Sequence, residues 1–306
     1  MPLFELDKEK LKAIHEEPFK LEKDIQRVVE NNLERLFAIR LVKSEFTIKN
    51  KRIDTLAFDE QSGGFVIIEY KRDRNFTVID QGFAYLSLML ENRGEFIVEY
   101  NESLGGELKR DDVDWSQSRV IFVAPDFTEN QKLASNFKDA AIELWEIKRY
   151  QGGIIGINPV KKTSNESIKQ LASRNSEIAE VASEIKVYAE EDHFVNASDV
   201  TRQLYEDIKA RILNLNGLTI APTKLYISFK LDGRIITDFS LQKKLIVQRI
   251  NLKEGQLDDP RGLFDAIPNK GHWGVGDYQG RYDENVDLDY LMSLVVQSYN
   301  FHRKSN

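Results

Sequence analysis

Hydrophobic positions recur at helical spacing in residues 21–36, where Leu, Ile and Val side chains lie three or four residues apart. Residues 46–49, 52–58 and 65–70 instead show the apolar patterns of strands, with a turn at residues 62–64. Helical spacing returns at residues 76–92, and residues 119–124 and 142–147 are apolar runs of the kind found in buried strands. The first half is therefore predicted to be an α/β domain with a central mixed sheet flanked by helices.

A polar stretch rich in Ser, Asn, Glu and Lys separates this half from the rest of the chain. Beyond it, the pattern predicts a helix at residues 200–213 and strands at 225–229, 235–239 and 245–250. A last helix is predicted at residues 287–299, with Asp287 as its N-cap. We therefore expect an α/β domain at residues 1–160, a partly helical connector at 161–198, and a smaller α+β accessory domain at 199–306.

Composition narrows the chemistry that these domains can carry. The 306 residues include no cysteine and only four histidines, which excludes disulfides, thiolate zinc sites and thiol nucleophiles. The net charge is −7, and neither half is basic, which argues against a pure nucleic-acid binder more strongly than against a nuclease. The sequence shows neither a signal peptide nor an apolar run long enough for a membrane span, so we expect a cytoplasmic protein without a membrane partner.

Three charged residues are predicted to converge in the first domain. Glu69 and Lys71 are two residues apart on one strand, so their side chains project from the same face. Asp54 lies on the preceding strand, and a hairpin turn near residues 63–64 places it roughly opposite Glu69. Two carboxylates that lie close together repel each other unless a cation lies between them, and oxygen ligands without Cys or His favour Mg²⁺ or Mn²⁺. Such a site suits phosphodiester hydrolysis.

These residues resemble the catalytic core of the PD-(D/E)XK nuclease superfamily, in which an acid on one strand precedes a (D/E)XK motif on the next. Asp54 and the tripeptide Glu69-Tyr70-Lys71 match that pattern, although Ile53 replaces the proline that commonly precedes the first acid. Gln81 and Tyr85 resemble the QxxxY motif on the following helix of RecB-like and NucS-like nucleases. The resemblance covers about the first 160 residues and is strongest to the NucS-like group.

The resemblance implies a metal-dependent DNA endonuclease, with roles in defence or repair. It implies that the metal is held by Asp54, Glu69, the backbone carbonyl of Tyr70 and a glutamate of the first helix. Glu22 is the first candidate for that glutamate, and Glu30 is the second. Lys71 would position the attacking water, while Gln81 and Tyr85 would support the site. RNA is a second candidate substrate, and a homodimer would pair two active sites for double-strand cleavage.

Four further residues are candidate substrate contacts. Arg72 and Arg74 follow the catalytic strand and are suited to phosphate binding, or they belong to a solvated loop. His272 and Trp273 lie in a glycine-rich segment where a base could stack, or they cap an ordered turn. The second half itself resembles an uncharacterised domain fused to such nuclease-like domains, in proteins that carry the label "predicted transport protein". The absence of a membrane span argues against that label.

Other interpretations explain the same residues without catalysis. Asp54, Glu69 and Lys71 could form a cross-strand salt-bridge cluster on a hairpin. The chain could be a non-catalytic nucleic-acid-binding or regulatory protein that keeps the nuclease fold. It could also be a structural interaction module whose second domain binds a protein or a small ligand.

Overall fold

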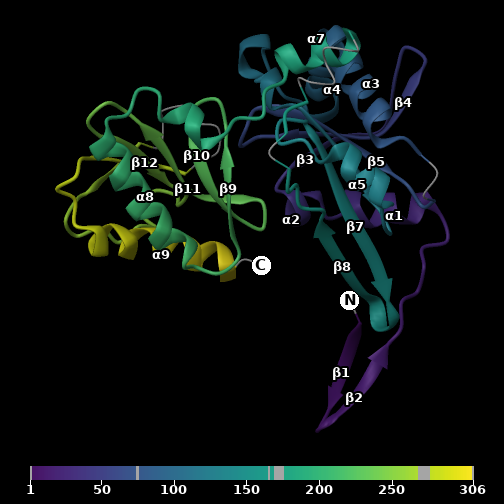
Figure 1. The fold of residues 1–306 in the computed structure, drawn as a ribbon, viewed down its shortest axis with the longest axis horizontal. Helices are drawn as coiled ribbons and strands as arrows, with labels where there is room; N and C mark the ends of the chain where they lie inside the picture. The colour runs from purple at the N-terminus through teal and green to yellow at the C-terminus, as the bar shows by residue number, and fades with distance from the viewer. Residues whose placement is uncertain (1, 74–75, 165, 169–175, 268–275, 305–306) are drawn as a thin grey trace. The chain divides into compact units, whose positions relative to one another are not determined.

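The computed structural model describes residues 2–73, 76–164, 166–168, 176–267 and 276–304 (Figure 1). The chain forms two compact units. The first consists of residues 1–32, 40–58 and 64–186, and the second of residues 33–39, 59–63 and 187–306. Arg74, His272 and Trp273, which were predicted to contact substrate, lie outside the described residues.

The first unit is built on a six-stranded sheet in the order β3-β4-β5-β6-β7-β8. Strands β5, β6 and β7 are mutually parallel, whereas β3 pairs antiparallel with β4 and β8 pairs antiparallel with β7. The strands are β3 Arg40–Ile48, β4 Lys51–Asp59, β5 Gly64–Tyr70, β6 Arg119–Ala124, β7 Ile142–Tyr150 and β8 Ile154–Pro159. A separate two-stranded sheet consists of β1 Leu3–Asp7 and β2 Lys10–Ile14.

Helices cover this sheet and close its core. Helix α1 contacts β5, α3 contacts β6, and α7 packs on α3. The polar stretch at 161–198 therefore joins the first unit up to residue 186, and only its last part belongs to the second unit. The apolar face of β5 packs with Phe83, Leu86 and Met89 of α3. The helices are α1 Glu22–Glu30, α2 Leu33–Phe37, α3 Val78–Glu91, α4 Arg93–Leu104, α5 Glu129–Ser135 and α7 Ser176–Glu184, with short 3₁₀ helices at Arg110–Asp112, Trp115–Gln117 and Gln151–Gly153.

The single helix predicted for residues 21–36 is two helices in the structure. Helix α1 ends at Glu30, and α2 begins at Leu33. Between them, the Asn32 amide donates a side-chain hydrogen bond to the Val28 carbonyl at 2.8 Å. Asparagine favours turns over helix interiors because its side chain competes for backbone hydrogen bonds. The two adjacent asparagines therefore end the helix although the apolar spacing continues.

The second unit is an antiparallel sheet in the order β13-β14-β12-β11-β10-β9, with helices α8 and α9 packed against it. The Asp287 side chain accepts hydrogen bonds from the Asp289 and Tyr290 amides, which confirms its predicted capping role. The elements are η4 Glu190–His193, α8 Asp199–Leu213, β9 Leu218–Pro222, β10 Ile227–Leu231, β11 Arg234–Leu241, β12 Ile246–Ile250, β13 Phe264–Ala266, β14 Tyr278–Tyr282 and α9 Leu288–Lys304. The two units confirm the predicted fold class of an α/β domain followed by a smaller α+β domain.

Candidate active site

Strand β5 carries two of the predicted catalytic residues at its end. Phe65 and Ile67 face the core formed with α3, and the two-residue period of a strand places Glu69 on the same face. Lys71 follows directly after the strand, and its amide donates to the Val123 carbonyl of β6 at 3.0 Å. The Lys71 ammonium donates to Glu69 Oε1 at 2.7 Å. The end of β5 therefore places a carboxylate and an ammonium in direct contact.

Asp54 reaches the same point from β4. Its Oδ2 atom accepts a hydrogen bond from the Tyr70 amide at 3.2 Å, which places it beside Glu69. Burial raises the pKa of Asp54 to about 6, and the negative charge of Glu69 contributes to the same rise. The structure therefore brings Asp54, Glu69, Tyr70 and Lys71 together, with two carboxylates close enough to repel each other.

Helix α3 supplies Gln81 and Tyr85 to this cluster. The Gln81 amide donates to Glu69 Oε1 at 3.2 Å and contacts the Tyr85 hydroxyl at 3.3 Å. The Tyr85 hydroxyl in turn donates to the Arg52 carbonyl of β4 at 3.4 Å. Burial raises the pKa of Tyr85 above its ordinary value, so the hydroxyl stays protonated. The two residues thus tie Glu69 to the neighbouring strand.

One oxygen of Glu69 has no hydrogen-bond partner. Glu69 is 5% exposed, and its Oε2 atom is buried without a donor among the described residues, whereas Oε1 accepts from both Lys71 and Gln81. A buried carboxylate oxygen without a partner is costly and rare in native proteins. A hard cation at this oxygen would remove that cost, and the adjacent Asp54 carboxylate offers a second ligand of the same chemistry.

The two helix glutamates have different surroundings. Glu22 begins α1, accepts a hydrogen bond from the Arg72 amide at 3.0 Å, and lines a pocket of about 710 Å³ together with Lys71 and Gln81. Glu30 lies at the other end of α1, where Thr55, Ser44 and Gln26 donate to its carboxylate. Glu22 is thus the helix glutamate that opens onto the pocket.

No group of three or more Asp, Glu or His residues close enough to hold a metal occurs within the part of the chain that the structure describes. Asp54 and Glu69 lie together, whereas Glu22 lies at the pocket wall and does not complete such a group with them. Mg²⁺ is commonly held in proteins by one or two carboxylates with water and substrate phosphate as its other ligands. The donor set present fits that kind of site.

Four pocket-lining residues were missed by the sequence reasoning, and Asp73, beside Arg72, is the first of them. Phe76, Pro125 and Asp126 line the same pocket as Lys71, and the Lys71 ammonium lies 6.0 Å from the centre of the Phe76 ring. Pro125 and Asp126 follow β6, which runs parallel to β5. Parallel strands end at the same edge of a sheet, and this rule could have identified both residues. Arg72, a predicted phosphate contact, also lines the pocket and donates to the Lys20 carbonyl at 2.8 Å.

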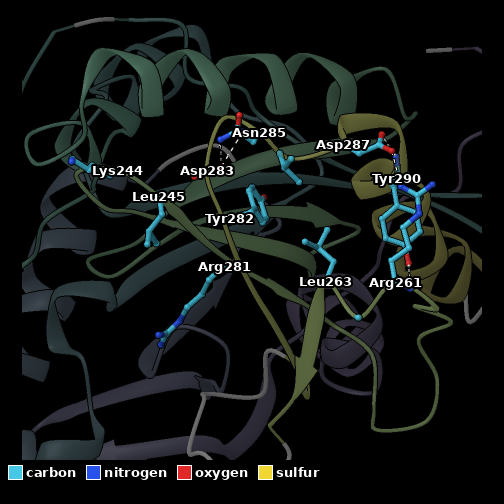
Figure 2. A pocket seen from close by; sticks show the side chains of 12 residues that line it. Lys244, Leu245, Arg261, Leu263, Arg281, Tyr282, Asp283, Asn285, Asp287 and Tyr290 are labelled. Atoms are coloured by element: carbon cyan, nitrogen blue, oxygen red, sulfur yellow. Dashed lines mark hydrogen bonds and ion pairs between the residues drawn. The ribbon is translucent and has the colours of Figure 1, made fainter.

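A second pocket, of about 640 Å³, lies in the second unit and contains none of the predicted site residues (Figure 2). At one end Arg261 stacks over the Tyr290 ring at 4.2 Å and donates to the Asp287 carboxylate at 2.7 Å. Asp283 accepts two hydrogen bonds from Asn285. Arg261 and Asp287 thus pair with each other, and Lys244 and Arg281 also line the pocket. In the described ranges, no helix is both long and apolar enough to cross a bilayer.

Comparison with known proteins gives a family match for the second unit and a relative that matches nearly the whole chain. Residues 190–302 match a family described as "Domain of unknown function (DUF5655)", in agreement with the uncharacterised domain expected there. A protein of Haemophilus influenzae (strain ATCC 51907 / DSM 11121 / KW20 / Rd), described as "Uncharacterized protein", is 49% identical over 300 residues, which cover 97% of this chain and 99% of that protein.

Three solved structures resemble part of the chain. A complex of EndoMS with double-stranded DNA matches 40% of this chain and 44% of its own, at 21% identity and a TM-score of 0.27. A repair endonuclease from Pyrococcus abyssi matches 39% and 44%, at 21% identity and a TM-score of 0.22. SfsA of Pyrococcus furiosus in complex with Ca²⁺ matches 45% and 59%, at 14% identity and a TM-score of 0.21. This chain spans less than half of the length of the two endonuclease chains.

Proposed function

This chain belongs to the same family as the Haemophilus influenzae protein, and we propose that it is a metal-dependent endonuclease that hydrolyses phosphodiester bonds in DNA. One observation carries the proposal. Asp54, Glu69 and Lys71 meet at one edge of the sheet, beside a pocket of about 710 Å³, and Glu69 has a buried oxygen without a partner there. A salt-bridge cluster alone would explain the contact between Lys71 and Glu69, but not the orphan oxygen or the second carboxylate.

The residues that would hold Mg²⁺ or Mn²⁺ are Asp54, Glu69 and the backbone carbonyl of Tyr70, with Glu22 at the pocket wall. When bound, the cation would supply charge neutralisation at the scissile phosphate and a more acidic water. Gln81 holds the carboxylate of Glu69 by donating to Oε1, which leaves Oε2 without a hydrogen-bond partner. Asp54 is fixed in the same way by the Tyr70 amide. Both carboxylates are therefore oriented before any ligand arrives.

In this proposal, Lys71 acts on the substrate. Its ammonium is bound to Glu69 at 2.7 Å, and 19% of its side chain is exposed at the pocket. An ammonium at this position can hold the attacking water or stabilise the negative charge that develops on the phosphate. Arg72 lines the same pocket and offers a guanidinium to a neighbouring phosphate of the strand. A phosphodiester with a negative backbone is the substrate that this arrangement fits.

The test is cleavage of labelled single-stranded, duplex, flap and mismatched DNA with Mg²⁺, Mn²⁺ or EDTA. Wild type is compared with Asp54→Asn and Lys71→Met, and with Asp111→Asn as a control at an exposed aspartate of the same unit. We expect metal-dependent cleavage by wild type and the control, and a loss of at least about 100-fold in the two site variants. Cleavage that persists in Asp54→Asn would refute the proposal. DNA binding without cleavage by wild type would favour the non-catalytic interpretation.

A further inference from the structure

The two-stranded hairpin at the start of the chain has little support from the rest of the first unit. Strands β1 and β2 form a sheet of their own, which adjoins the end of β7 and β8 through the residues that follow β2 (Figure 1). Glu16 forms a bridge with Tyr150, and the Gln151 amide donates to the His15 carbonyl at 2.9 Å. Beyond these contacts, the burial pattern of both strands is almost entirely exposed.

The hairpin has one apolar face and one charged face. Its register pairs Leu6 with Leu11 and Phe4 with Ala13, and side chains of paired residues share a face. Phe4, Leu6 and Leu11 are 49%, 67% and 66% exposed. The other face pairs acids with lysines across the strands, Glu5 with Lys12 and Asp7 with Lys10. Three large apolar side chains therefore lie uncovered side by side on one face.

This conformation requires a cover for the apolar face. An isolated two-stranded hairpin is at best marginally stable in water, because it buries too little apolar surface to offset the ordering of its backbone. The turn adds strain, since Lys8 has a φ of 55°, a left-handed conformation that costs a residue other than glycine about 1–2 kcal/mol. The contacts of the hairpin with β7 and β8 leave the apolar face open.

The charges of the hairpin indicate which kind of partner could cover its apolar face. Strands and turn together contain three acids and three lysines, so the hairpin has no net charge to attract a phosphate backbone or an anionic lipid surface. The apolar face carries no charged side chain, so a second copy can meet it without burying an unpaired charge. In a two-fold dimer, the same surface of both chains is in contact, and two uncharged apolar faces can pack against each other in this way. We infer that this hairpin is a dimerisation arm that packs against the same hairpin of a second chain.

The exposed area sets the expected strength of this dimer. At about 200 Å² for a fully exposed large apolar side chain, the three residues offer on the order of 350 Å² per copy. Ile154 and Ile155 on the edge strand β8 are 42% and 37% exposed, but neighbouring side chains of a strand point to opposite faces, so only one of them can extend this surface. With one of them, the surface is on the order of 430 Å² per copy. The total of about 900 Å² lies below the 1,200–2,000 Å² or so of stable complexes. We therefore expect a reversible dimer with a dissociation constant in the micromolar range or above.

Sedimentation equilibrium of the full chain over a wide range of concentrations tests this inference. We expect a monomer–dimer equilibrium in wild type and at least tenfold weaker association in Leu6→Glu. Glu5→Gln, on the charged face of the same strand, is the matched control and should associate as wild type does. Wild type that stays monomeric at the highest concentrations would overturn the inference, as would equal weakening in both variants.

Cross-linking provides a second test that does not require the arm to be disrupted. The chain has no cysteine, so a single introduced cysteine reports only on its own surroundings. With a short bismaleimide, Leu6→Cys should give covalent dimers, and Glu5→Cys should give few. Equal yields, or none from Leu6→Cys, would overturn the inference. If wild type stays monomeric and Leu6→Glu loses DNA binding while Glu5→Gln keeps it, nucleic acid is the occupant instead. Neither measurement uses cleavage, so a failure of the dimer and a failure of the proposed nuclease are distinguishable.

Discussion

Replacing Asp54 with asparagine should make the metal-free protein more stable while it removes activity. The folded state raises the pKa of Asp54 from 3.8 to about 6, through burial and the nearby charge of Glu69. A rise of about two pKa units corresponds to about 3 kcal/mol of destabilisation when the group is ionised. Asp54 is only partly buried, so solvent screening reduces this to about 1–2 kcal/mol. Asparagine removes the charge and can still accept the hydrogen bond from the Tyr70 amide.

The stability gain of Asp54→Asn should depend on pH, because the pKa of Asp54 is higher in the folded state than in the unfolded state. Well below pH 4, Asp54 is protonated in both the folded and the unfolded state, so it costs little stability. As the pH rises through 4 towards 6, the unfolded state loses its proton first, and the folded state becomes less stable relative to it. Well above pH 6, the full cost is present. The advantage of Asp54→Asn should therefore be small at pH 4 and complete at pH 7.5.

Urea unfolding followed by circular dichroism measures this difference. With an m-value of about 2 kcal/mol/M, a gain of 1–2 kcal/mol moves the midpoint of Asp54→Asn up by about 0.5–1 M at pH 7.5. Saturating Mg²⁺ should reverse the order, because it stabilises only a chain that binds it, by about 2.7 kcal/mol at 100 times the dissociation constant. Asp111→Asn should unfold as wild type does. An advantage that is absent at pH 7.5, or equally large at pH 4, would refute the reasoning.

Three further predictions concern the cluster and the strand that carries it. Lys71→Met should lower cleavage by about 100-fold or more while Mn²⁺ binding, measured by electron paramagnetic resonance, stays intact; equal loss of both would assign Lys71 to folding of the site. Thr55→Val should cost about 1–3 kcal/mol in urea unfolding, because Glu30 and the Tyr70 hydroxyl lose a shared partner, whereas Thr55→Ser should cost far less. Gly64→Ala should destabilise by about 1–3 kcal/mol, because a Cβ atom there would lie 2.7 Å from the Gln117 carbonyl oxygen. Gly94→Ala, where a Cβ atom meets nothing within 4 Å, is its control and should be neutral or stabilising.

The strand that carries the cluster was predictable because its sequence carries two signals at once. The apolar run before Glu69 requires burial on both faces, and β5 is buried throughout. The spacing of Glu69 and Lys71 fixes their common face, and the contact between them follows. Helix α3 could be predicted in the same way, since its apolar spacing and the positions of Gln81 and Tyr85 on one face agree.

Other parts of the molecule could not be predicted because their sequences lack the regular spacing of apolar residues that marks a buried face. The hairpin of β1 and β2 is exposed on both faces, so its residues read as a polar N-terminal segment. Helix α4 buries only Phe96 of its twelve residues, too few for a periodic signal. The hydrogen bonds from Ser44 and Thr55 to Glu30 join residues 14 and 25 positions apart in the sequence. Single-sequence patterns report local spacing, and such pairings arise only when the sheet has formed.

At the end of strand β5, neighbouring side chains point to opposite faces of the sheet and make different polar contacts. Glu69 contacts Gln81 and Lys71, which line the pocket. The Tyr70 hydroxyl instead contacts Thr55 at 3.0 Å in the polar cluster around Glu30. Because neighbouring side chains of a strand alternate, adding or deleting one residue here would send tyrosine to the pocket and the carboxylate to the polar cluster. Substitutions along this strand can be tolerated one at a time, but a change of its length cannot. Across the family, the segment from Gly64 to Lys71 should therefore be free of insertions and deletions even where its sequence diverges.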